Sequence, residues 1–330
     1  MISKTYKMAV MIFVMTLVWI LDGCSHSVSQ ESEVKTVKLD YAYYNPVSLV
    51  LKEKKWLEDD LKKDGIGVEW IFSAGSNKSL ELLNSRSIDF GSTSGASALL
   101  GRANGNPIKS IYVFSKPEWT ALVVRADSPI KKVKDLKGKK IAVTRGTDPY
   151  IFLLRALGTA GLSEKDVEIV QLQHPDGKTA LEKGDVDAWA GLDPYMAQTE
   201  IEKHSKLFFR HPDWNTYGFL NVREEFAKDH PEIVKKVLKA YEKARKWALE
   251  NPDEFEKLVA AESKQNDKVA AKVIHRTDLT NPVIGEVHKR TIEASGEVLL
   301  KSGAMEKSVD IKKTADNLID PEYIENINKK

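Results

Sequence analysis

The stretch KKIAVTRGTDPYIFLLRALGTAG, residues 139–161, decides the fold. Its opening residues, KKIAVT, form a short apolar run typical of a buried strand, and YIFLLRALGTAG has the apolar spacing of a helix. The segments VEIVQL (167–172), DGKTALEKG (176–184) and DVDAWAG (185–191) then predict a strand, a helix and a strand. Strands that alternate with helices in this way predict an α/β fold.

An earlier block of the chain repeats this order. Residues 37–44, 67–72 and 87–93 predict strands, and residues 46–64 and 77–85 predict helices. Matching residues recur about 100 positions apart, and the pairs are Asn45-Pro46 with Asp148-Pro149, Lys78 with Lys178, and Asp89 with Asp187. The repeat predicts two related lobes, each a mostly parallel sheet flanked by helices, with a cleft between them.

Beyond Gly218 the chain consists of long, charged segments with helical periodicity. One face of residues 224–251 carries apolar residues at helical spacing, namely Val234, Val237, Leu238, Tyr241, Ala244 and Ala248. We expect this face to pack on a sheet while the lysines face water.

Polar loops follow the predicted strands and lead into helices. In α/β sheets ligands bind beyond the carboxyl ends of strands, and helix N-termini bind anions through their free N–H groups. Hydroxyl groups in these loops that could add hydrogen bonds belong to Ser76, Thr93, Ser94, Thr144 and Thr147. The same residue types are common in helix caps and turns, so each one alone fits a structural role equally well. As a set drawn from both blocks, they favour a site for a small anion.

Two further groups of side chains could take part in such a site. Arg145 could pair with a sulfonate or carboxylate, or it could point to solvent. The aromatic residues near the loops could line an apolar wall, and these are Tyr41, Tyr43, Tyr44, Trp119, Trp189 and Tyr195. Strand alternation places Tyr41 and Tyr43 on one face and Tyr44 on the other, so at least one of the three belongs to the core. We assign Trp70 and Trp189 to the core as well.

Composition and motifs argue against other classes of function. The formal net charge is +2 with mixed acidic and basic residues, which gives no footprint for nucleic acid. Metalloprotease, serine-hydrolase and phosphate-loop motifs are missing, so we expect no catalytic residue, no metal and no cofactor. His174 is the one histidine near a predicted cleft loop, and a single loop histidine is usually structural or solvated. An enzyme acting on a pyrimidine precursor would be expected to carry a reactive cysteine or clustered histidines, and a sensory module would need a further domain.

The N-terminus predicts export. Lys4 and Lys7 precede an apolar run of about 14 residues, which fits a secretory signal better than a membrane span. Cys24, the only cysteine, ends the sequence LDGC, which resembles the lipobox of bacterial lipoproteins except at Asp22. We expect a signal peptide over residues 1–23, a lipid on Cys24 that anchors the protein to the extracytoplasmic face of the cell membrane, and a flexible tether over 24–36. A plain signal peptide with an incidental cysteine is the alternative.

Four motifs carry a resemblance to a known family. They are RSIDFGST (86–93), DSPIKKVKDLKGKKIAVTRGTD (127–148), RALGTAGL (155–162) and LEKGDVDAWAGLDPY (181–195). In this order they resemble the solute-binding lipoproteins of ABC importers, in the group that binds aliphatic sulfonates and taurine. Binders of nitrate and of pyrimidine precursors share the framework, so those ligands stay open as alternatives.

The resemblance implies a type II periplasmic-binding-protein fold, with lobe I at 37–122 and 219–330, lobe II at 123–218, and crossovers near 119–125 and 217–222. It also implies a monomer that closes around its ligand and delivers it to a permease served by an ATPase. The predicted ligand-binding residues are Tyr44, Asn45, Ser76, Asn77, Thr93, Ser94, Trp119, Arg145, Thr147, Asp148 and Asp193.

Overall fold

The computed structural model describes residues 34–328. The predicted signal peptide and Cys24 lie outside the described residues, as does most of the predicted tether. Contacts divide the chain into Met1–Val34 and Lys35–Lys330, and every element below lies in the second unit. Among the described residues, no helix is long and apolar enough to cross a membrane.

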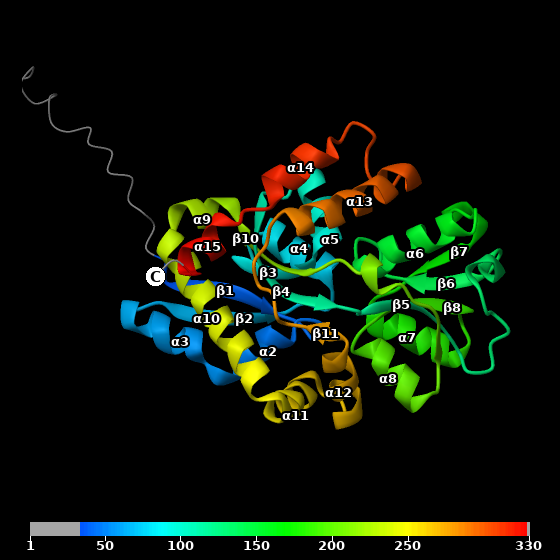
Figure 1. The fold of residues 1–330 in the computed structure, drawn as a ribbon, viewed down its shortest axis with the longest axis horizontal. Coiled ribbons are helices and arrows are strands. Elements are labelled where there is room, and N and C mark those ends of the chain that lie inside the picture. The colour runs from blue at the N-terminus through cyan, green and yellow to red at the C-terminus, as the bar shows by residue number, and fades with distance from the viewer. Residues whose placement is uncertain (1–33, 329–330) are drawn as a thin grey trace, which may run out of the picture. The chain divides into compact units, whose positions relative to one another are not determined.

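Two mixed sheets form the framework (Figure 1). The first has the order β11 (Thr277–Asp278), β4 (Ile108–Pro117), β10 (Gly218–Arg223), β3 (Phe90–Ser94), β1 (Thr36–Tyr41), β2 (Gly67–Phe72). The second has the order β7 (Glu168–Gln171), β6 (Lys140–Val143), β8 (Ala188–Leu192), β5 (Thr120–Val124), β9 (Lys206–Phe209).

The two sheets repeat one arrangement, which confirms the predicted doubling. In each, the first strand of a block lies between the second and the third, and these neighbours are parallel. Asp89 and Asp187 have the same role, because each carboxylate accepts a hydrogen bond at 2.9 Å from a backbone N–H in the first strand of its block, Lys38 in β1 and Lys140 in β6. The prediction of mostly parallel sheets is wrong for the rest of each sheet. There, β10 and β5 pair antiparallel with their neighbours, because each enters its sheet from the connection to the other.

The helices follow the predicted segments closely. They are α2 (Pro46–Lys54), α3 (Trp56–Leu61), α4 (Ser76–Asn84), α5 (Gly95–Ala103), α6 (Asp148–Thr159), α7 (His174–Lys183), α8 (Tyr195–Glu202), α9 (Glu224–Asp229), α10 (Pro231–Glu250), α11 (Pro252–Ser263), α12 (Asp267–His275), α13 (Glu286–Ser302), α14 (Ile311–Leu318) and α15 (Glu322–Asn328). Short 3-10 turns include η4 (Glu164–Asp166) and η5 (Pro212–Trp214). One predicted helix, 46–64, is broken: Lys55 adopts a left-handed conformation that ends α2 and starts α3 at a new angle.

Burial agrees with most of the core predictions. The predicted apolar face of α10 is buried throughout, and Trp189 is fully buried between Ala142, Leu181 and Met196 in the second sheet's core. The prediction for Trp70 is wrong: it is only half-buried, and its indole N–H donates to Glu58 at 2.7 Å. The reason is that β2 is an edge strand, which leaves one side of Trp70 uncovered.

Two connections join the sheets, and they are tied to each other. Residues 118–119 lead from β4 to β5, and residues 210–217 lead from β9 back to β10. The guanidinium of Arg210 donates to both oxygens of Glu118, at 2.7 and 2.8 Å. The side chain of Asn215 accepts from the backbone N–H of Thr120 at 2.8 Å. These contacts make the two connections a single paired link between the sheets.

Candidate functional site

Four helices begin where strands of the two sheets end. The first sheet supplies α4 after β2 and α5 after β3, and the second supplies α6 after β6 and α7 after β7. A helix N-terminus carries free N–H groups and partial positive charge. The contact between α5 and α6, and the close approach of the α4 and α7 starts, bring the four N-termini into one region.

Asp148, the first residue of α6, ties both connections to the second sheet. One carboxylate oxygen accepts from the indole N–H of Trp119 at 2.8 Å and from the backbone N–H of Thr216 at 2.9 Å. The other accepts from the hydroxyl of Thr216 at 2.8 Å, and that hydroxyl oxygen accepts from the backbone N–H of Ala96 in α5 at 3.2 Å. Burial raises the pKa of Asp148 to about 6, although these hydrogen bonds oppose the shift. These hydrogen bonds to protein groups favour a positioning role for Asp148, and its direct contact with a ligand stays a prediction.

The loops of the two sheets approach each other closely at Gly75, which precedes α4. A Cβ on Gly75 would lie 2.9 Å from Oδ1 of Asn77 and 3.0 Å from Nε2 of His174, the first residue of α7. Gly146, in the loop before α6, also faces Asn77, since its Cβ would lie 3.8 Å from the Cβ of Asn77. The α4 N-terminus of one sheet thus meets the α6 and α7 N-termini of the other.

Polar atoms at this meeting point have no hydrogen-bond partner among the described residues. They are Oδ1 of Asn77, Nε2 of His174 and, from the cap of α7, Oε1 of Gln173, and all three atoms are buried. Buried polar atoms are nearly always paired in proteins, so three unpaired ones at the junction of two sheets indicate a ligand site.

The tautomer of His174 follows from its neighbour. The hydroxyl of Thr144 donates to the carbonyl of Leu172 at 2.7 Å, so toward Nδ1 of His174, 3.3 Å away, it can only accept. Nδ1 therefore carries the ring proton and Nε2 presents a lone pair. Burial lowers the pKa of His174 to about 3, so the ring stays neutral near pH 7.

Two predicted residues on the loop after β1 are anchored within the first sheet. Tyr44 donates its hydroxyl to the carbonyl of Ser92 at 2.7 Å, and its ring packs edge-on against Trp119 at 5.9 Å. Asn45 caps α2 by accepting from the N–H of Ser48 and donates to the hydroxyl of Ser92 at 2.8 Å. Both side chains shape the floor of the region.

Three hydroxyl residues predicted in this sheet are also engaged. Ser76 accepts from the N–H of Ser94 at 2.9 Å, which links the starts of α4 and α5. Ser94 caps α5, and Thr93 accepts from the side chain of Asn221 at 2.8 Å. These contacts are the cap and turn roles that the residue types favour.

Two predicted residues of the second sheet, Thr147 and Asp193, are also engaged by protein groups. Thr147 donates to the carbonyl of Thr144 at 2.6 Å, which closes the turn before α6. Asp193 accepts from the N–H of Ala197 at 2.8 Å and pairs with Arg276 at 3.3 Å, and burial raises its pKa to about 6. Like Asp148, it is held by protein groups, which favours a structural role, and its contact with a ligand stays a prediction.

Arg145 is also committed to protein partners. Its guanidinium forms an ion pair with Glu164 and donates to the hydroxyl of Tyr150 at 2.7 Å. Both terminal nitrogens of the guanidinium are engaged by Glu164 and Tyr150, which weighs against the bidentate ligand contact, and that contact stays a prediction.

Aromatic side chains lie beside the site. Phe72, at the end of β2, packs on Tyr43 at 4.7 Å and on Tyr41 at 5.4 Å. Burial raises the pKa of Tyr195, which opens α8, to about 12, with smaller contributions from the charges of Tyr43 and Asp176. Tyr44 is buried while Tyr41 and Tyr43 are half-buried, as the strand alternation predicted.

The sequence did not single out Gly75, Gln173 or Thr216 as site residues, and it assigned His174 to a structural role. Gln173 and His174 did carry a signal, since they directly follow a predicted strand and open a helix. Thr216 lies in a connection without a regular pattern, and only the fold brings it to Asp148.

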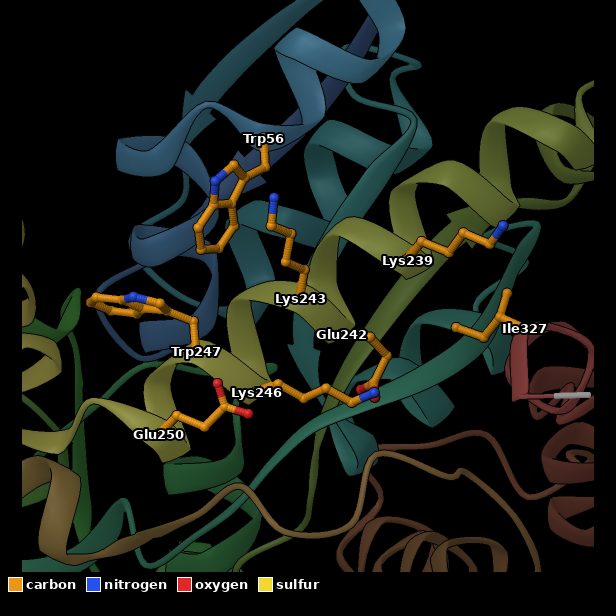
Figure 2. A pocket seen from close by; sticks show the side chains of 8 residues that line it. All are labelled: Trp56, Lys239, Glu242, Lys243, Lys246, Trp247, Glu250 and Ile327. Carbon is orange, nitrogen blue, oxygen red and sulfur yellow. The ribbon is translucent and has the colours of Figure 1, made fainter. Parts of the chain in front are cut away.

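A separate groove of about 450 Å³ lies on α10, away from the strand ends (Figure 2). Trp56 and Trp247 meet edge-on in it, and lysine side chains of the protein lie over both rings: Lys243 at 4.3 Å from Trp56 and Lys54 at 4.1 Å from Trp247. Since the protein's own cations cover these aromatic faces, the groove is a weaker candidate than the junction of the sheets.

The buried neutral state of His174 gives a pH-dependent prediction. Its pKa lies near 3 in the folded protein and near 6.5 when unfolded, so its contribution to stability is complete above pH 6.5 and is lost as the pH falls toward 3. Relative to a His174→Asn variant, which keeps a donor for Thr144, the parent should lose about 2 kcal/mol between pH 7.5 and pH 5. Urea unfolding at both pH values measures this; equal changes in the two proteins would contradict the assignment.

Comparisons with known proteins agree on one family. A family model described as NMT1/THI5 like matches residues 49–255. A Bacillus subtilis protein named for aliphatic sulfonate binding is 29% identical over 93% of this chain and 94% of its own. The taurine-binding periplasmic protein of Escherichia coli is 31% identical over 58% of this chain and 61% of its own. The crystal structure of the periplasmic aliphatic sulphonate-binding protein SsuA from Escherichia coli superposes with a TM-score of 0.73 at 25% identity, covering 85% of this chain and 91% of that one. The predicted two-lobed fold is confirmed.

Proposed function

The chain belongs to the NMT1/THI5-like family, and we propose that it is the extracytoplasmic substrate-binding subunit of an ABC importer for a small organic sulfonate, either an alkanesulfonate or taurine. The observation that carries this proposal is the meeting of helix N-termini from both sheets around the unpaired atoms of Asn77 and His174. The sulfonate would accept from N–H groups at the starts of α4, α6 and α7.

The unpaired atoms favour one ligand within this class. Nε2 of His174 and Oδ1 of Asn77 are both hydrogen-bond acceptors. They therefore suit a hydrogen-bond donor on the ligand and do not suit an anionic group. An aminosulfonate such as taurine carries both parts, an ammonium to donate and a sulfonate to accept. The aromatic side chains of Tyr43, Phe72 and Tyr195 would flank the short carbon chain between them.

Ligand capture would proceed by closure of the two lobes, for which we retain the predicted bounds 37–122 with 219–330, and 123–218. The paired connections at 118–119 and 210–217 are the hinge, and the ligand stabilises the closed form because it contacts both lobes. No covalent bond is made or broken, so the protein is a carrier and not an enzyme. Seven of the predicted residues hold the binding loops in place, namely Tyr44, Asn45, Ser76, Thr93, Ser94, Trp119 and Thr147.

The cellular setting follows the same proposal. After removal of residues 1–23, a lipid on Cys24 anchors the protein to the outer face of the membrane, and residues 24–36 tether the lobes. A monomer then delivers its ligand to a permease that an ATPase drives.

A ligand panel tests the proposal. The chain from residue 25 onward is melted with taurine, propane-1-sulfonate, sulfate, nitrate and a pyrimidine precursor. A ligand at 100 times its dissociation constant adds about 2.7 kcal/mol of stability. We expect taurine to raise the melting temperature most, and propane-1-sulfonate, which replaces the ammonium with a methyl group, to raise it less. Stabilisation by nitrate or the pyrimidine precursor, and by no sulfonate, would leave the carrier role but overturn the substrate.

A further inference from the structure

A second groove lies between the two halves of the chain, away from the strand ends. Its volume is about 580 Å³, within the range of small-molecule sites. One wall is the outer part of α6 with η4, and the other is the C-terminal part of α13, which packs on α6. In Figure 1, α13 comes from the C-terminal part of the chain and reaches over toward α6.

The groove carries positive charge that no acid balances. Arg155, Lys165 and Lys301 line it, and none has a carboxylate within ion-pair distance among the described residues. The one acidic residue of the lining, Glu164, is held by Arg145 and by the hydroxyl of Tyr150 at 2.7 Å. A half-buried guanidinium without an acidic partner is unfavourable on its own, which suits it to an incoming anion.

The protein also holds the guanidinium of Arg155 in place. It stacks over the ring of Trp214 at 4.4 Å, and Trp214 packs in turn on Phe152 and Phe209. Burial lowers the pKa of Arg155 from its ordinary value, in keeping with a cation that lacks a countercharge. An arginine fixed in this way binds an anion with little loss of side-chain entropy.

Apolar side chains complete the lining. Leu154 and Leu162 from the α6 wall face Val298 from α13. We propose that this groove is a second binding site, separate from the sulfonate site, for a small amphiphilic anion with one anionic head group on Arg155 and a short apolar tail between α6 and α13.

Occupancy of this groove would be coupled to lobe closure. The same helix, α6, begins at the sulfonate site with Asp148 and ends at the groove, while α13 packs on α5 and α14 of the other half. A molecule that contacts both α6 and α13 favours one relative position of the halves. By linkage it then changes the affinity of the sulfonate site, and the reverse effect has the same size.

Calorimetric titration of hexane-1-sulfonate into the chain from residue 25 onward tests the proposal. An Arg155→Gln/Lys301→Gln variant should bind at the groove about tenfold more weakly. A control that removes the same charges at exposed sites outside the groove, Arg290→Gln/Lys313→Gln, should bind like the parent. Hexylammonium, with the same tail and the opposite charge, should not bind there.

The two sites are separated by their own variants. In a His174→Asn/Asn77→Ala protein, whose sulfonate site is altered, the hexane-1-sulfonate binding that belongs to the groove should persist, and it should weaken about tenfold when Arg155→Gln/Lys301→Gln is added. Taurine binding should survive the groove variant. If hexane-1-sulfonate binds the His174→Asn/Asn77→Ala protein with or without the two groove substitutions alike, or not at all, the second site is overturned, whatever the fate of the proposed function.

Discussion

Replacing Asp148 with alanine should lower the free energy of unfolding by about 3 kcal/mol and remove the stabilisation by ligand. The substitution leaves the indole N–H of Trp119 and the backbone N–H of Thr216 buried without acceptors. It also frees the hydroxyl of Thr216, which links α6 to Ala96 of α5. Since both connections between the sheets meet at this carboxylate, the start of α6 would no longer be held where the ligand needs it. Urea unfolding and the melting shift with ligand measure the two effects.

An Asp148→Asn variant separates hydrogen bonding from charge. Its amide oxygen can still accept, so it should be more stable than Asp148→Ala. Burial raises the pKa of Asp148 to about 6 in the folded protein. Below pH 4 the carboxyl group is protonated in both the folded and the unfolded protein, so it adds little to the free energy of folding. Above pH 6 it is ionised in both, and the folded protein bears the full free-energy cost of the buried charge. The parent's stability relative to Asp148→Asn should therefore fall as the pH rises from 4 to 6. A difference that stays constant over this range, or an alanine variant as stable as the parent, would show that Asp148 does not have this role.

The fold was predictable where it depends on local pattern. The strand GVEWIF matches β2 residue for residue, and the apolar positions of α10 are all buried, because alternation and helical periodicity act over neighbouring residues. The break at Lys55 and the antiparallel entry of β5 and β10 could not be predicted this way. The first is a single left-handed residue, and the second depends on how two distant connections cross between the sheets.

The site was predictable in position but not in the roles of its residues. Loops at strand ends were the correct region, since helix N-termini converge there. The sequence could not show that Glu164 would form an ion pair with the guanidinium of Arg145, because the two residues lie 19 positions apart on either side of a helix. Nor could it show that the glycine before α4 would meet the histidine that opens α7, since that contact depends on how the two halves fit together.

Replacing Gly75 with alanine should weaken ligand binding on the order of 10- to 100-fold while the protein keeps most of its stability. The φ angle of Gly75 is 174°, an extended value that any residue adopts, so backbone strain is not the reason. The reason is space: the new Cβ would lie 2.9 Å from Oδ1 of Asn77 and 3.0 Å from Nε2 of His174. To relieve these contacts both side chains must shift, and they are the two groups proposed to receive the ligand's donor.

Titration of taurine into the Gly75→Ala protein, alongside urea unfolding, measures both quantities. Gly67→Ala is the matched control, because a Cβ there would meet its nearest neighbour at an ordinary 3.6 Å and the residue lies at the far end of β2 from the site. It should change taurine affinity little. Unchanged affinity in Gly75→Ala would place the ligand away from Asn77 and His174. Because the alanine methyl group would displace the side chains of Asn77 and His174, a loss of affinity with intact stability would mean that the ligand requires these two side chains in their present positions.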